Sequence, residues 1–190
     1  MVLAYCALDG RLKVWGGTKG HRTALADSFA DFTLGRPGLF KAMAARRLYT
    51  LEPAEQARGA FAFRHGHEER IESVRIYEAQ ANRTAINVRS RAERTVFSVV
   101  VRDTRGEALR LLHESRPDIS YGNGWKLDHL TLKVMLRTGG PQLRALTVKI
   151  KPVETVSFQR HKYQALVMEL LRLNGMLLAR DVGVTALAAE

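Results

Sequence analysis

The stretch that decides the fold is residues 127–174, LDHLTLKVMLRTGGPQLRALTVKIKPVETVSFQRHKYQALVMELLRLN. Apolar and polar residues alternate on both sides of the Gly-Gly-Pro segment at 139–141, which is the pattern of two half-buried strands joined by a turn. Apolar residues then recur at the spacing of a helix with one buried face: Tyr163, Leu166, Val167, Leu170 and Leu171. The stretch therefore predicts a β-hairpin followed by an amphipathic helix over residues 155–174.

Positive charge gathers in the same stretch. Between Lys133 and Lys162 there are seven basic residues and one acid, Glu154, so this window contributes +6 of the formal net charge of +11. An excess of this kind favours an anionic partner, nucleic acid first and an acidic protein surface second. Charge alone does not distinguish DNA from RNA.

The composition is that of an ordinary folded protein, with 46% hydrophobic and 26% charged residues in a chain of 190. The single cysteine, Cys6, excludes an internal disulfide framework and a cysteine-based zinc site, which favours a reducing compartment. No apolar run approaches the roughly 20 residues of a membrane span. We therefore expect a cytoplasmic protein without membrane contact.

Strand-like alternation begins upstream of this stretch, at Ile71. Val74 and Ile76 alternate with polar or aromatic neighbours, residues 80–83 are typical of a polar turn, and a returning strand runs through Ile86. Residues 94–102 are apolar enough for a central strand, and residues 107–113 fit either a strand or a helix.

These patterns predict an α+β fold. We expect an antiparallel β-sheet of about five strands packed on a long C-terminal helix, preceded by a small, mainly helical N-terminal part. The expected domains are residues 1–60, a hairpin with short helices, and residues 61–190, the β-rich domain with the C-terminal helix.

A sheet that packs one face on a helix leaves its other face free. On that face, alternation places basic side chains beside a tyrosine, a combination suited to phosphates and base stacking. Together with the basic residues at the start of the flanking helix, the predicted nucleic-acid-binding residues are Arg75, Tyr77, Arg89, Lys133, Arg137, Lys149, Lys151, Arg160 and Lys162.

The pattern favours a non-enzymatic nucleic-acid-binding protein or subunit. One alternative is a protein-interaction module that presents the same face to an acidic partner, and another is a solvated face that resists aggregation. The oligomeric state is left open.

The expected strand at residues 127–132 also carries His129 and Thr131 on one of its faces. This His-x-Thr pattern resembles one half of the signature of the 2H phosphoesterases, which are RNA ligase-like and cyclic phosphodiesterase enzymes with two such motifs. The resemblance implies that paired histidines act as general acid and base on a 2′,3′-cyclic phosphate. The second motif would have to be residues 21–23, His-Arg-Thr, where an arginine replaces the apolar residue and a helix is expected to start.

Two further segments contain residue types that bind small ligands. His65, His67 and two glutamates are metal-ligand types close together in sequence, but Gly66 favours a solvated loop. The glycine-rich residues 16–20 lack the spacing of a Walker A loop and favour a connector. We therefore expect neither a metal nor a cofactor.

Overall fold

A computed structural model describes residues 1–6, 10–41, 48–86, 93–140, 142–152, 155–158 and 161–178. The internal contacts of the chain form two compact units, Met1–Leu48 together with Leu178–Glu190, and Tyr49–Leu177. The boundary expected between residues 60 and 61 stays a prediction.

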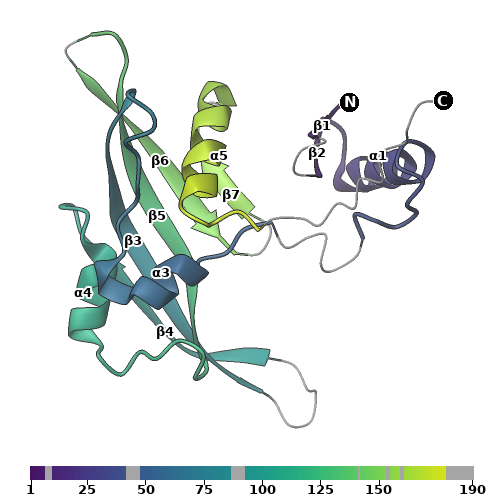
Figure 1. Cartoon of the computed structure of the whole chain (residues 1–190). Helices are drawn as coiled ribbons and strands as arrows, with labels where there is room; N and C mark the ends of the chain where they lie inside the picture. Colours follow the sequence, from purple (N-terminus) through teal and green to yellow (C-terminus); the bar gives the residue numbers. More distant parts are fainter. Residues whose placement is uncertain are drawn as a thin grey trace. The chain divides into compact units, whose positions relative to one another are not determined.

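The first unit contains an antiparallel hairpin of β1 (Val2–Cys6) and β2 (Arg11–Trp15), followed by α1 (Lys19–Phe32) (Figure 1). The helix begins after Thr18, whose hydroxyl oxygen accepts a hydrogen bond from the His21 backbone N–H at 3.3 Å. This bond satisfies one of the free N–H groups in the first helical turn. The glycine-rich residues 16–20 therefore lead directly into a capped helix.

The second unit is built on a five-stranded antiparallel sheet with the strand order β4-β3-β5-β6-β7 (Figure 1). The α+β architecture with an antiparallel sheet is confirmed. The strands are β3 (Ile71–Ile86), β4 (Glu93–Arg102), β5 (Trp125–Arg137), β6 (Leu143–Lys151) and β7 (Thr155–Phe158).

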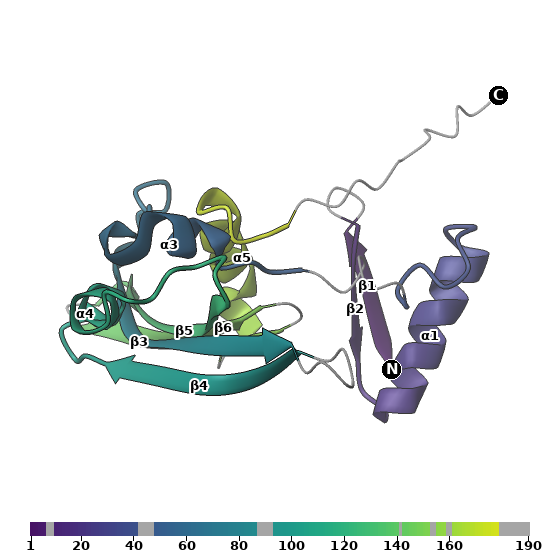
Figure 2. The same cartoon turned by 90° about the horizontal axis from the view of Figure 1, so that it is seen from below.

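One hydrophobic core lies between this sheet and three helices, α3 (Glu52–Ala57), α4 (Ala108–Ser115) and α5 (Gln164–Leu173). Figure 2 shows α3 and α5 over the same face of the sheet. Two short 3-10 turns, Arg58–Ala60 and His161–Tyr163, adjoin α3 and α5. Alternate residues of β5 and β6 bury their side chains in this core, as their period of two predicts: Leu130, Leu132, Val134, Leu136, Leu146, Val148 and Ile150.

The prediction of a long C-terminal helix over residues 155–174 is wrong. The C-terminal helix on the sheet is α5, which has only ten residues and begins at Gln164. The preceding Thr155–Phe158 forms β7 instead, where Val156 and Phe158 pair with Ile150 and Val148 of β6. These two apolar residues are separated by Ser157, so the segment has the strand period, and pairing with an edge strand packs its apolar side against the core.

The expected turn at residues 80–83 is also absent, because β3 continues without a break through this polar segment. Ala79 and Ala81 are fully buried on the core side. Gln80 and Asn82 lie on the other side and find partners on neighbouring strands, so their polar groups do not require a turn. Residues 107–113, which fitted either a strand or a helix, lie largely in α4.

Candidate functional site

The candidate site is the sheet surface opposite the core, which we call the open face. Within the second unit, no described helix covers this face (Figure 2). Cross-strand register places its central side chains on four strands, namely Arg75, Glu78, Gln80, Asn82, Ser98, Arg102, His129, Thr131, Lys133, Lys149 and Lys151.

Most of the predicted binding residues that are described lie on or beside the open face. Lys149 and Lys151 belong to β6, and Arg137 ends β5, where it forms an ion pair with Glu72. Lys162 lies in the turn before α5, with its ammonium 5.0 Å from the centroid of the Tyr163 ring. Two of the nine predicted residues, Arg89 and Arg160, fall outside the described residues.

Two basic residues face each other directly. Arg75 of β3 and Lys133 of β5 are register partners, and the Lys133 ammonium lies 4.1 Å from the centroid of the Tyr77 ring. Among the described residues, no carboxylate forms an ion pair with Arg75 or Lys133. Like charges directly opposite each other on a sheet are destabilising. The pair therefore gains from any anion that binds between the two side chains.

The centre of the open face holds a buried acid. The Glu78 side chain forms an ion pair with Arg102, and its Oε1 lies 2.7 Å from His129 Nε2 and 3.3 Å from the Thr131 hydroxyl. Glu78 is only 8% exposed and His129 only 5%, although no described helix of the second unit covers them. Hydrogen bonds from Arg102, and next from His129, lower the pKa of Glu78 to about 2 against the opposing effect of burial. Glu78 is therefore an anion with saturated hydrogen bonding at neutral pH.

A second acid holds the other side of the same imidazole. Asp128 Oδ2 lies 3.0 Å from His129 Nδ1, and Asp128 Oδ1 accepts a hydrogen bond from the Asn82 amide at 3.1 Å. Both ring nitrogens of His129 thus face carboxylates, and the ring can donate to both only when each nitrogen carries a hydrogen. Lys149 approaches Glu78 at 3.8 Å and Lys151 approaches Asp128 at 4.0 Å. The two carboxylates are surrounded by cations and leave the rim of the face basic.

Alternation along the sequence does not place Glu78 or Asp128 on this face, because both depend on β-bulges. Tyr77 is an extra residue between the pairs Ile76–Leu132 and Glu78–Thr131, and the register shift moves Glu78 to the open face. Asp128 is likewise extra between the pairs formed by His129 and Leu127. The polar run Glu78, Gln80, Asn82 inside an otherwise strand-like segment is the sequence signal that could have identified the buried polar centre.

The His-x-Thr segment has only part of the geometry of the phosphoesterase pattern. His129 and Thr131 share the open face, and both contact Glu78. A general acid or base needs a ring nitrogen that can reach the substrate, whereas both nitrogens of His129 are bonded to carboxylates. Residues 21–23, the expected second motif, lie on α1 and not on a strand. This geometry does not favour the enzymatic alternative.

Comparisons of the chain with protein-family models, curated proteins and solved structures found no match. In the part of the chain that the structure describes, no group of three or more His, Cys, Asp or Glu side chains could hold a metal ion. No helix among those same residues is long and apolar enough to cross a membrane.

Proposed function

We propose that this protein binds nucleic acid through the open face, with backbone phosphates held by Arg75 and Lys133. The observation that carries the proposal is the direct cross-strand pairing of these two cations without a carboxylate partner among the described residues. Directly opposed residues on antiparallel strands have Cβ atoms about 5 Å apart, so both side chains can reach one phosphate group. An anion between them removes their repulsion and supplies the missing partner.

The surroundings of the pair favour an extended polyanion over an isolated small anion. Arg102, Lys149 and Lys151 continue the positive charge across the neighbouring strands, and the register places all three on the open face. The acids at the centre are bonded within the sheet and are shielded by these cations. Such a surface suits tracking of a phosphate backbone, whose charge repeats along its length.

The open face offers little for reading bases. The Tyr77 ring on this face already contacts the Lys133 ammonium. Single-strand binders usually stack several bases on several rings, so we expect phosphate contacts to dominate. Contacts to phosphates carry no direct sequence information, and we therefore expect similar affinity for different sequences. A cytoplasmic location, as expected from the sequence, would give access to RNA.

The proposal is tested by measuring the fluorescence anisotropy of short labelled RNA and DNA, single-stranded and duplex, at low salt. The double variant Arg75→Gln/Lys133→Gln removes the pair and should weaken binding about tenfold or more. The matched control, Arg110→Gln/Arg172→Gln, removes the same charge from α4 and α5 and breaks only exposed ion pairs. It should bind within about twofold of the wild type.

Two outcomes would overturn the proposal. One is that the wild type binds no nucleic acid at low salt, and the other is that both double variants bind equally well. If an acidic protein instead co-purifies with the chain and is released by salt, the open face serves the alternative, a protein interface.

A further inference from the structure

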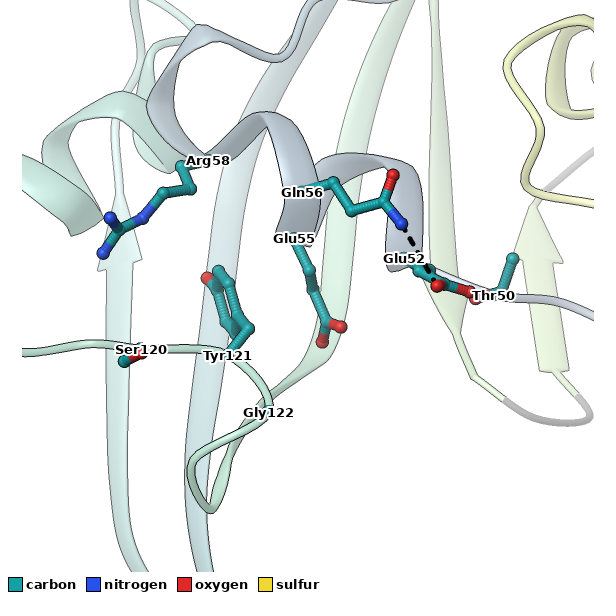
Figure 3. Close-up of a pocket in the computed structure, with 8 residues that line it drawn as sticks. All are labelled: Thr50, Glu52, Glu55, Gln56, Arg58, Ser120, Tyr121 and Gly122. Atoms are coloured by element: carbon teal, nitrogen blue, oxygen red, sulfur yellow. Dashed lines mark hydrogen bonds between the residues drawn. The ribbon is translucent and has the colours of Figure 1, made fainter.

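Both carboxylates in the pocket beside α3 already have hydrogen-bond partners (Figure 3). The pocket has a volume of about 510 Å³ and lies between α3 and the loop that leads into β5. Glu52 accepts a hydrogen bond from the Gln56 amide at 3.1 Å, and Glu55 accepts one from the Leu127 backbone N–H at 2.6 Å. In the described part of the second unit, backbone groups without a strand partner lie instead along one edge of the sheet.

Strand β4 forms this edge (Figure 2). No described strand pairs with its outer side, and its backbone groups alternate in direction, as in any antiparallel strand. The Asp103 backbone N–H donates to the Tyr77 carbonyl oxygen of β3 at 2.9 Å. The backbone groups of the alternate residues Arg102, Val100 and Ser98 therefore point away from β3. Such an edge is a template for a further strand.

The side chains along the middle of β4 are apolar and exposed. Val96 is 57% exposed, Phe97 47% and Val100 48%. The strand contains neither lysine nor proline, the residues that commonly prevent pairing at a sheet edge. A neighbouring strand would cover these side chains and remove apolar surface from water. The edge therefore has both the backbone groups and the side chains that favour a partner strand.

The sequence of β4 is complementary to a second copy of itself. Two antiparallel copies are related by a two-fold axis perpendicular to the sheet, so residues that oppose each other must share a face. Val96 is the extra residue of a bulge against β3. With Ser98 on the axis and Val96 again extra, every pair shares a face. The opposed pairs are then Ser98 with Ser98, Phe97 with Val99, Thr95 with Val100, Arg94 with Val101, and Glu93 with Arg102.

The two ends of this register are also complementary in charge. Arg102 opposes Glu78 of β3 on the open face. Glu93 lies on the same face, where its carboxylate contacts the Thr84 hydroxyl at 2.6 Å and the Lys126 ammonium at 2.7 Å. In the register centred on Ser98, Glu93 of each copy opposes Arg102 of the other, and opposite charges in directly opposed positions stabilise a strand pair. This symmetry of charge favours a second copy over an unrelated strand.

We infer that the protein forms a two-fold dimer in which β4 pairs antiparallel with β4 of a second copy, centred on Ser98. The pairing joins the two five-stranded sheets into one continuous sheet with both open faces on the same side. The contact involves a single strand from each copy, so its area is small and the dimer dissociates in the micromolar range. The inference concerns the edge of the sheet and does not depend on nucleic-acid binding by the open face.

Dimerisation is tested by sedimentation velocity of the full-length protein between about 1 and about 500 µM. The average mass of the wild type should rise towards twice that of the chain. Glu93→Arg places like charges opposite each other at both ends of the interface, and Val100→Lys adds a cation near its centre. Because each change occurs twice in the dimer, each variant should dimerise about tenfold more weakly or worse. The matched control Glu114→Arg reverses an exposed acid on α4 and should dimerise like the wild type.

The register is tested by disulfide cross-linking of Ser98→Cys in a Cys6→Ser background, since Cys6 is exposed. Opposed Cα atoms about 5.5 Å apart are within disulfide range, so mild oxidation should cross-link this variant about tenfold faster than Glu114→Cys in the same background. The inference is overturned if the wild type stays monomeric throughout the series or if Glu93→Arg and Val100→Lys both dimerise unchanged. It is also overturned if Ser98→Cys cross-links no faster than Glu114→Cys.

Discussion

At the scale of single residues, Gly106 determines how Arg75 is presented on the open face. Its φ of +92° is a conformation that favours glycine, and a Cβ at this position would lie 2.4 Å from Arg75 Cβ. The Gly106 carbonyl oxygen also accepts a hydrogen bond from the Ile76 backbone N–H at 3.1 Å. The stem of Arg75 therefore lies against a glycine that has no room for a side chain.

Replacing Gly106 by alanine should destabilise the protein more than a positive φ alone explains. Gly139 provides the control, since its φ is +80° and nothing lies within 4 Å of an added Cβ. We expect Gly139→Ala to cost about 1 kcal/mol in the free energy of unfolding, and Gly106→Ala about 2–3 kcal/mol because of the added clash. Urea denaturation of both variants measures this difference. Equal losses would show that Arg75 can move away from Gly106 freely.

The buried acid at the centre of the open face should make stability depend on pH in the acidic range. The pKa of Glu78 is about 2 in the folded protein against 4.5 as its ordinary value, so its folded-state interactions favour the ionised form. That stabilisation is complete above about pH 4.5 and is lost as the pH falls towards 2. The advantage of the wild type over Glu78→Gln should therefore shrink over this window.

Free energies of unfolding measured across that window for both proteins check this prediction. Glu114→Gln, which removes an exposed acid from α4, controls for the loss of one carboxylate. A wild-type advantage over Glu78→Gln that stays constant from neutral pH to pH 2 would contradict the lowered pKa.

At the scale of secondary structure, the sequence predicts the hairpin of β5 and β6 well because no bulge interrupts the strands between Leu130 and Leu136. Their alternation translates directly into a buried and an open side. β3 is harder to predict, since two of its three register shifts against β5 insert an extra residue into β3 and change which of its residues face the core. Bulges depend on pairing with the neighbouring strand, which local alternation does not contain. The same reason explains why Glu78 and Asp128 were not predicted at the site, whereas Lys133 and Lys149 were.

The length of the last helix shows a related limit. Residues 155–158 have a strand-like pattern too short to outweigh the helical period that follows, and only the free edge of β6 gives them a partner. The remaining helix, α5, still buries four apolar side chains in ten residues. We therefore expect this short helix to contribute strongly to the stability of the core.

Leu170→Ala should lower the free energy of unfolding by about 2–5 kcal/mol, because Leu170 is fully buried in the core. Leu173, on the same helix, is 38% exposed, and Leu173→Ala should cost less than about 1 kcal/mol. Denaturant midpoints of the two variants measure the contrast. Similar losses of unfolding free energy in the two variants would mean that burial of the Leu170 side of α5 does not hold the helix in place.

At the scale of the whole molecule, part of the excess positive charge gathers on one surface. Cross-strand pairing brings Arg75, Lys133 and Lys149 together from three strands. Composition predicted an anionic partner, and alternation predicted which side of the hairpin carries the lysines. The juxtaposition of Arg75 and Lys133 required the register of β3 against β5, which only the folded structure provides.

The most direct test of nucleic-acid binding by the open face is the dependence of binding on salt concentration. The logarithm of the association constant for a short labelled RNA should fall linearly with the logarithm of salt concentration. Each neutralised phosphate contributes about one unit of slope, and the pair is proposed to hold one phosphate, so Arg75→Gln/Lys133→Gln should have a slope smaller by about one. An unchanged slope in this variant, with the control Arg110→Gln/Arg172→Gln also unchanged, would contradict phosphate binding by the Arg75–Lys133 pair.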